Sequence, residues 1–88
     1  GASALICAAA CGHLETVRLL IDRGAELDTQ STEGASSLIL AAQNGHVEVI
    51  RLLCQRGADV NIEAQNGLTA LMCARNRNFV EISQILMQ

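Results

Sequence analysis

The side chains best suited to chemistry are two cysteines and a histidine near the start of the chain. Cys7, Cys11 and His13 bring two thiols and an imidazole, which are ligand types that zinc prefers, into a short segment. A structural zinc site normally needs four such ligands. The residues 33 positions after Cys7 and Cys11 are Leu40 and Asn44, so the set is neither repeated nor completed. We therefore predict no metal site and no cofactor.

Catalysis is not indicated elsewhere in the sequence. There is no glycine-rich phosphate loop, no His-Glu zinc-protease motif and no nucleophile elbow. His13 and His46 each follow a glycine at equivalent positions of a repeat, so a structural role at a turn is the simpler interpretation. The acidic residues form no facing pair and are interpreted as solvated charge: Asp22, Glu26, Asp28, Asp59 and Glu63. We predict that the protein is not an enzyme.

Length and composition limit the range of architectures and partners. The chain has 88 residues, enough for one small domain, and Phe79 is its only aromatic residue. A net charge of −3 with mixed signs favours neither nucleic acid nor an anionic membrane. No apolar run approaches the ~20 residues of a membrane span. The cysteines at positions 7, 11, 54 and 73 are interpreted as reduced, buried thiols, which predicts a cytoplasmic or nuclear protein.

A repeat of 33 residues organises the chain. Superposing residues 1–33 on residues 34–66 gives 16 identical positions, among them the steps Gly12-His13 and Gly45-His46. Such a period marks an array of units, none of which can bury its apolar face alone. We predict units of about residues 1–30, 31–63 and 64–88. The third copy is weaker and keeps in register Gly67, Leu71, Ala74, Val80, Glu81 and Leu86.

The repeated residues resemble the ankyrin repeat. The second copy, from Gly34 to Asn61, reads Gly-Ala-Ser-Ser-Leu-Ile-Leu-Ala-Ala-Gln-Asn-Gly-His-Val-Glu-Val-Ile-Arg-Leu-Leu-Cys-Gln-Arg-Gly-Ala-Asp-Val-Asn. The resemblance covers essentially the whole chain and implies an all-α solenoid whose helix-turn-helix units are joined by β-hairpin-like loops. Some family residues are replaced, and we expect this to remove part of the hydrogen-bond network that stiffens the turns. The family's Pro is Ala4, Ser37 and Ala70, its His is Ile6, Ile39 and Met72, and its turn Asp is Ser31 and Ala64.

Helix signals recur in each unit. Ser3, Ser36 and Thr69 each precede an alanine-rich apolar run and are predicted N-caps. Glycines at positions 12, 24, 45 and 57 are predicted to end helices in the left-handed conformation. The expected helices cover residues 4–11, 37–44 and 70–77 for the first of each pair, and residues 14–23, 47–56 and 80–87 for the second. Inward-facing positions of the second helices are predicted at Val17, Leu20, Ile21, Ile50, Leu53 and Cys54.

The segments 25–35 and 58–68 are candidates for a binding surface. Each ends in a turn signal, Glu33-Gly34 or Asn66-Gly67, and the resemblance implies fingers that form a concave surface with the first helices. Residues that differ between copies there are not needed for stacking, yet the scaffold aligns them. We predict that a partner protein or peptide binds through Thr32, Glu33, Ala35, Gln43, Asn44, Gln65, Asn66, Leu68, Asn76 and Arg77, with Ala2, Ala10 and Cys11 at the corresponding places of the first unit. The alternative is a structural spacer or capping segment of a larger array, with no ligand of its own.

The third unit breaks the repeat at three places. Arg75 takes the position of an alanine in the earlier copies, Asn78 that of the turn glycine and Phe79 that of the histidine. One interpretation is a terminal capping unit, which needs a polar outer face because no neighbour stacks on it. The other is that Arg75 and Arg77 bind an acidic partner, since arginine makes bidentate contacts with carboxylates.

The start of the chain suggests a larger context. Gly1 falls inside the turn of a unit and no initiator methionine precedes it, so we expect a piece of a longer array. Both end faces of a short array expose apolar helix surface, and end-to-end stacking on a second copy is therefore an open alternative for self-association.

Overall fold

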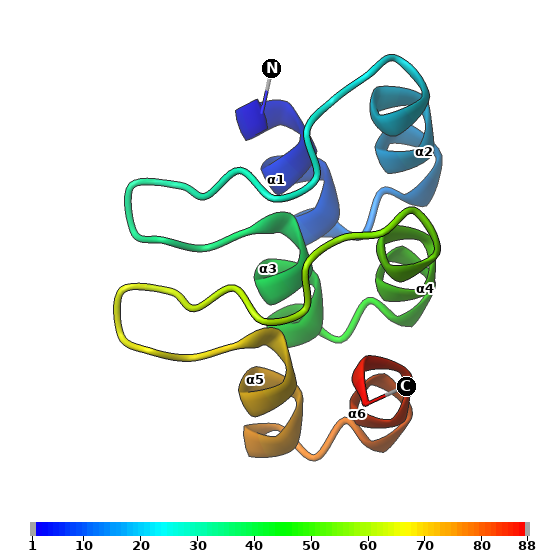
Figure 1. The fold of residues 1–88 in the computed structure, drawn as a ribbon. Helices are drawn as coiled ribbons and strands as arrows, with labels where there is room; N and C mark the ends of the chain where they lie inside the picture. Colours follow the sequence, from blue (N-terminus) through cyan, green and yellow to red (C-terminus); the bar gives the residue numbers. More distant parts are fainter. Residues whose placement is uncertain (1, 88) are drawn as a thin grey trace.

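Three helix pairs stack in a row to form the molecule (Figure 1). The computed structural model describes residues 2–87, with side chains for residues 4–87. The pairs are α1 (Ala2–Cys11) with α2 (Leu14–Asp22), α3 (Ser37–Asn44) with α4 (Val47–Gln55), and α5 (Ala70–Asn76) with α6 (Val80–Leu86). The helices α1, α3 and α5 form an inner layer, and α2, α4 and α6 form an outer layer. The predicted all-α solenoid is thereby confirmed, and residues 2–87 contain no β-strand.

Helix boundaries agree with the prediction to within one residue at every end except the start of α1. The hydroxyl of Ser36 accepts a hydrogen bond from the Ile39 N–H at 3.3 Å, and Thr69 does the same for Met72 at 3.3 Å. Both N-caps are therefore confirmed. The prediction that Ser3 is an N-cap is wrong, because α1 begins at Ala2 and already includes Ser3 in its helical backbone.

Small and aliphatic side chains fill the space between the two layers. Ala9 and Ala42 have no exposed surface, which lets the inner helices approach closely. The larger buried side chains are Leu5, Leu38, Ile50, Leu53 and Ile82. Burial of each such side chain stabilises the fold by about 2 kcal/mol relative to exposure. Of the predicted inward positions, Val17, Ile50 and Leu53 are buried, while Leu20, Ile21 and Cys54 pack half-buried against the core.

The turn between the two helices of a pair has the same geometry in the second and third units. Gly45 ends α3 with φ of 79°, and the N–H of the next residue donates to Ala41 at 3.0 Å. In the third unit Asn78 takes the same left-handed conformation, with φ of 61°, and the Phe79 N–H donates to Ala74 at 2.9 Å. Asparagine tolerates this conformation better than most residues with a side chain, so the turn survives the loss of glycine. The other predicted turn glycines, at positions 12, 24 and 57, also have positive φ.

Two long fingers, residues 25–35 and residues 58–68, project from the same side of the stack (Figure 1). At the tip of the first finger the Gly34 N–H donates to the Ser31 carbonyl at 2.9 Å, which closes a tight turn. The expected loss of turn hydrogen bonds is wrong at Ser31, because its hydroxyl accepts from the N–H groups of Glu33 and Ala35 at 3.3 and 3.2 Å. A short hydroxyl can replace the carboxylate there, since the required acceptor sits close to the backbone.

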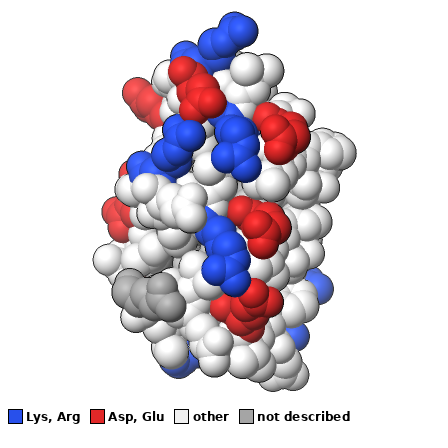
Figure 2. Space-filling view, turned by 90° about the vertical axis from the view of Figure 1, so that its right-hand side faces the viewer, with Lys and Arg blue, Asp and Glu red and all other residues white. Residues whose placement is uncertain are grey.

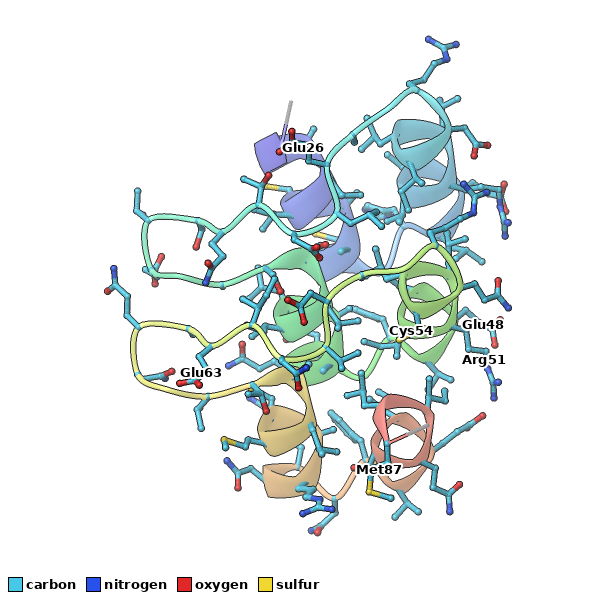
Figure 3. The ribbon with its side chains drawn as sticks, in the orientation of Figure 1. Glu26, Glu48, Arg51, Cys54, Glu63 and Met87 are labelled. Atoms are coloured by element: carbon cyan, nitrogen blue, oxygen red, sulfur yellow. The ribbon has the colours of Figure 1, made fainter. Side chains whose placement is uncertain are left out.

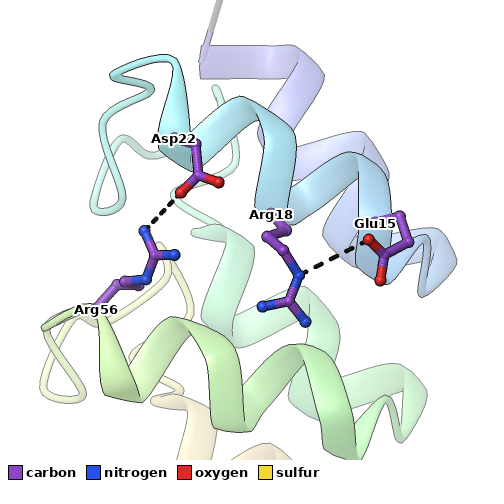
Figure 4. Close-up of polar contacts among 4 residues, drawn as sticks. All are labelled: Glu15, Arg18, Asp22 and Arg56. Carbon is purple, nitrogen blue, oxygen red and sulfur yellow. Dashed lines mark hydrogen bonds and ion pairs between the residues drawn. The ribbon is translucent and has the colours of Figure 1, made fainter.

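Ion pairs follow the outer layer of helices, where Figure 2 shows acidic and basic side chains alternating along the face. Two join residues three apart on one helix: Glu15–Arg18 at 3.8 Å and Glu48–Arg51 at 3.6 Å. Two more join neighbouring units: Arg56–Asp22 at 2.9 Å, drawn in Figure 4, and Arg51–Glu81 at 2.6 Å. Since all these side chains are substantially exposed, each pair contributes only a few tenths of a kcal/mol.

The four cysteines have different environments. Cys73 is buried and Cys54 is half-buried, but Cys7 and Cys11 are exposed, so the prediction of buried thiols is wrong for these two. Both lie on the solvent side of α1, whose core-facing side is taken by leucine and alanine. Burial raises the pKa of Cys54, and burial raises the pKa of Cys73 against an opposing effect of the nearby Arg77 charge. None of the helices within residues 2–87 has the length and apolar character needed to cross a membrane.

Candidate functional site

A groove lies between the two fingers and the inner helices α3 and α5. Its volume is about 200 Å³, and its walls come from both fingers and both helices. The lining residues are Glu33, Ala35, Ile39, Leu40, Gln43, Ala64, Asn66, Leu68 and Cys73. Six of the nine are apolar and are buried or half-buried, while Glu33, Gln43 and Asn66 are exposed and form its rim. The groove can therefore hold an apolar side chain and offer polar contacts around it.

Half of the predicted binding residues line this groove. They are Glu33, Ala35, Gln43, Asn66 and Leu68, five of the ten predicted positions. The side chains of Glu33 and Gln43 make no hydrogen bond or ion pair with any residue in 4–87, so both are free to meet a ligand. Asn66 is partly committed, because its Oδ1 accepts from the Leu68 N–H at 3.1 Å.

Two predicted binding residues instead connect one unit to the next. Asn44 donates from Nδ2 to the carbonyl of Ala10 at 2.9 Å. Gln65 donates from Nε2 to the carbonyl of Thr32 at 2.6 Å, and its backbone N–H donates to Glu33 at 3.2 Å. These side chains differ between copies of the repeat, yet they act as structural links between units. A difference between copies is thus an imperfect guide to a binding role.

The remaining predicted residues do not line the groove. Thr32 is exposed at the tip of the first finger. Asn76 and Arg77 are exposed at the C-terminal end of α5. Burial raises the pKa of Cys73, which lines the groove, and the charge of Arg77 acts in the opposite direction. Arg75 turns elsewhere: its Nη2 lies 3.2 Å from the sulfur of Met87. The structure therefore separates the two arginines that the sequence treated as one feature.

Sequence reasoning missed two contributors to this side of the molecule. Gln30 donates from Nε2 to the carbonyls of Gly34 and Glu63 at 2.6 and 2.9 Å, so one side chain ties both fingers together. Met72 is 47% exposed on α5. Its position could have been found, because Met72 lies one helical turn before the predicted Asn76 and therefore on the same face. No signal in a single sequence marks Gln30, since its partners are backbone carbonyls.

Other hollows lie on the outer layer or at the end of the stack. One of about 440 Å³ is lined by Arg51, Cys54, Gln55, Ala58, Val60 and Ile85, but Arg51 is already paired with Glu48 and Glu81. Cys7, Cys11 and His13, the side chains with ligand types suited to zinc, form no such site. Within residues 2–87, no group of three or more histidine, cysteine or acidic side chains is placed to hold a metal ion.

Comparison with known proteins agrees with the helix pairs and fingers. A family model described as ankyrin repeats in three copies matches residues 1–64. The chain belongs to the ankyrin repeat family. No match was found among curated proteins. Ankyrin repeats are generally protein–protein interaction modules and are typically not enzymes.

The ankyrin match stops near the middle of the second finger. The unmatched residues include the third helix pair, where Arg75, Asn78 and Phe79 depart from the repeat. The fold nevertheless continues, since α5 packs on α3 and α6 on α4 as in the preceding pairs. This ankyrin chain thus presents its groove between a regular second unit and a divergent third unit.

Proposed function

We propose that this ankyrin chain binds a partner protein or peptide in the groove between its fingers and inner helices. The observation that carries the proposal is the composition of the groove: an apolar base with the unpaired side chains of Glu33 and Gln43 at its rim. Apolar pockets with a few free polar groups are typical ligand sites. Neither a cofactor nor a chemical step is part of the proposal.

The walls of the groove are held in place by contacts within the protein. Gln65 and Gln30 connect the two fingers through three hydrogen bonds, and Gln30 makes a fourth within the first finger. A partner would therefore meet a surface that is already ordered. Preorganisation favours affinity because less conformational entropy is lost on binding.

The test compares capture of proteins from a cell extract by three forms of the chain. Gln43→Arg places a long charged side chain at the groove, and Gln55→Arg adds the same charge on the outer helix α4. Both sites are exposed helix positions, so neither change should unfold the protein. Proteins retained by the wild type and by Gln55→Arg but lost from Gln43→Arg would support the proposal. Equal capture by all three forms would overturn it.

A second candidate role, capping of the array by the third unit, is favoured by a separate observation. Arg75 stands where Ala9 and Ala42 are completely buried against the next inner helix. Asn78 occupies the position that Gly12 has in the first unit. A Cβ added at Gly12 would lie 2.5 Å from the imidazole of the following unit, and Asn78 already carries such a Cβ. Both residues disfavour the stacking of a further regular unit, as expected of a cap.

Self-association provides the test of the cap. We expect the wild type to stay monomeric in sedimentation experiments, and Arg75→Ala/Asn78→Gly to associate end to end by exposing an alanine-and-glycine face. Arg77→Ala is the control, because it removes a charge without altering that face. Equal association of the wild type and the double variant would contradict the cap.

Two further elements of the proposal concern the partner and the compartment. Arg77 is the residue that we propose to meet an acidic group of the partner, while Arg75 serves the cap. The exposed thiols of Cys7 and Cys11 stay reduced in a cytoplasmic or nuclear environment, so we propose the cytoplasm as the location, with the nucleus as the alternative.

A further inference from the structure

The fingers carry only acidic charge, whereas the helices and their ends carry both acidic and basic residues. All six basic residues are arginines, and none lies in the fingers, residues 25–35 and 58–68. The fingers carry five acidic residues: Glu26, Asp28, Glu33, Asp59 and Glu63. None of these five forms an ion pair within residues 4–87, whereas all four acidic residues of the helices do. The outer face is therefore internally neutralised, and the finger face is not.

Two of the five finger carboxylates have no partner within residues 4–87. Glu26 is contacted by the Thr29 hydroxyl, Asp28 accepts from the Asp59 N–H, and Asp59 accepts from the Asn61 N–H. The carboxylates of Glu33 and Glu63 make no hydrogen bond or ion pair with residues 4–87. Figure 3 places Glu63 on the second finger, on the opposite side of the molecule from Glu48 and Arg51.

Glu33 and Glu63 stand on backbone that is tied together. The Glu33 carbonyl accepts from the Gln65 N–H at 3.2 Å, and the Glu63 carbonyl accepts from Gln30 Nε2 at 2.9 Å. The same Gln30 amide donates to Gly34, the residue after Glu33, at 2.6 Å. The backbone at the two glutamates therefore belongs to adjacent parts of the two fingers. Glu33 itself lines the groove, and Glu63 precedes the lining residue Ala64.

The groove also has an apolar base and a positively charged far end. Ile39, Leu40 and Leu68 provide aliphatic surface between the fingers and α3. Arg77 lies at the opposite end from the fingers, after the last turn of α5, where its charge acts on Cys73. The fingers therefore carry only acidic charge, and the basic side chain of Arg77 lies beyond the last turn of α5.

We propose that the partner is a peptide segment that places an apolar side chain in the groove and a lysine or arginine against Glu33 and Glu63. This inference rests on the proposed function and specifies the chemistry of its ligand. Charge complementarity favours a cation at the fingers, and Arg77 disfavours a second cation at the other end. The peptide consequently binds in one direction, with its basic residue toward the fingers.

The partner chemistry is tested by selecting binders from a library of random peptides displayed on phage, using three baits, and the selected peptides are also tested against Gln43→Arg. The first is the wild type. The second is Glu33→Lys/Glu63→Lys, which reverses the finger charge. The third, Glu15→Lys/Glu48→Lys, changes the net charge by the same amount on the outer face, where Arg51 keeps Glu81 as a partner. Selected peptides are then synthesised and their Kd values measured at low and high salt.

We expect peptides selected by the wild type to be enriched in lysine or arginine next to an apolar residue. Their Kd should rise by about tenfold or more with Glu33→Lys/Glu63→Lys and much less with Glu15→Lys/Glu48→Lys. Added salt should weaken binding to the wild type, because screening acts on exposed charges. If the selected peptides are not enriched in basic residues but fail to bind Gln43→Arg, this inference is overturned and the proposed function stands. Selection insensitive to Gln43→Arg, or no selection at all, would overturn both.

Discussion

The imidazole of His46 reaches back across the interface between two units to the backbone of Ala10, with Nε2 lying 2.9 Å from the carbonyl oxygen. Because a carbonyl oxygen only accepts hydrogen bonds, Nε2 carries the proton. The same imidazole fills the space left by the missing side chain of Gly12. At the next interface the ring of Phe79 fills the equivalent space against Gly45, with no hydrogen bond. The two interfaces of one array are thus built from different chemistry.

His46→Ala should lower the free energy of unfolding by about 1 kcal/mol, because it removes a partly buried hydrogen bond and a packing contact. The loss is limited because Asn44 still donates to the same carbonyl. His13→Ala is the matched control, since His13 occupies the equivalent position of the first unit and is exposed. Urea unfolding followed by circular dichroism measures both. Equal losses for the two variants would show that the interface contact of His46 contributes nothing.

Gly12→Ala should destabilise more than Gly24→Ala, although both glycines have positive φ, of 76° and 92°. Both variants bear the backbone strain of about 1–2 kcal/mol. At Gly12 the added Cβ would also lie 2.5 Å from Nδ1 of His46, whereas at Gly24 it would meet no atom within 4 Å. We expect an extra loss of roughly 1–3 kcal/mol at Gly12 from overpacking. That extra loss should shrink in a His46→Ala background, and a double-mutant cycle in which it persists would contradict the proposed contact.

Gln65→Ala should reduce stability by about 0.5–1.5 kcal/mol, because Gln65 connects the two fingers. Gln43→Ala should leave stability within about 0.5 kcal/mol of the wild type, since its side chain has no partner in the described part of the chain. The free energy of unfolding of each variant, measured by equilibrium unfolding, distinguishes a side chain with a structural role from one that is free to bind. A stability loss of the same size in Gln43→Ala would remove that distinction.

Stability should fall at alkaline pH through the two shielded thiols. The pKa values of Cys54 and Cys73 are raised in the folded protein, so the folded state holds the thiol protons more tightly than the unfolded state. Their contribution is fully present below the unfolded thiol pKa of about 8.5 and is lost as the pH rises through the folded value. Cys54→Ala/Cys73→Ala should flatten the alkaline decline in unfolding free energy. An alkaline decline that is unchanged in Cys54→Ala/Cys73→Ala would refute this assignment.

The repeat predicts the fold of this chain well, because each unit must pack its apolar face against a neighbouring unit of similar shape. The helices, the caps at Ser36 and Thr69 and the left-handed turns all follow from residues that recur. The N-cap prediction fails at Ser3, because a capping serine and a serine in the first helical turn look alike in a sequence. The prediction of burial fails at Cys7 and Cys11, because a cysteine count does not reveal which side of α1 a thiol occupies.

The candidate site is less accessible to sequence reasoning. Residues that differ between copies include ligand candidates such as Gln43 and structural links such as Asn44, and only the donor–acceptor geometry tells them apart. The segregation of charge is visible in the sequence as a finger composition, but its significance depends on which carboxylates are already paired. Knowing that Glu81 is paired and Glu63 is not requires the spatial relation of the units.

The replacement of an imidazole by the Phe79 ring at the second interface has a thermal consequence. Apolar contacts weaken on cooling, whereas a hydrogen bond such as that of His46 does not share this dependence. The two junctions of the array therefore respond differently to temperature. On cooling, we expect the contact of Phe79 with Gly45 to weaken before that of His46 with Ala10.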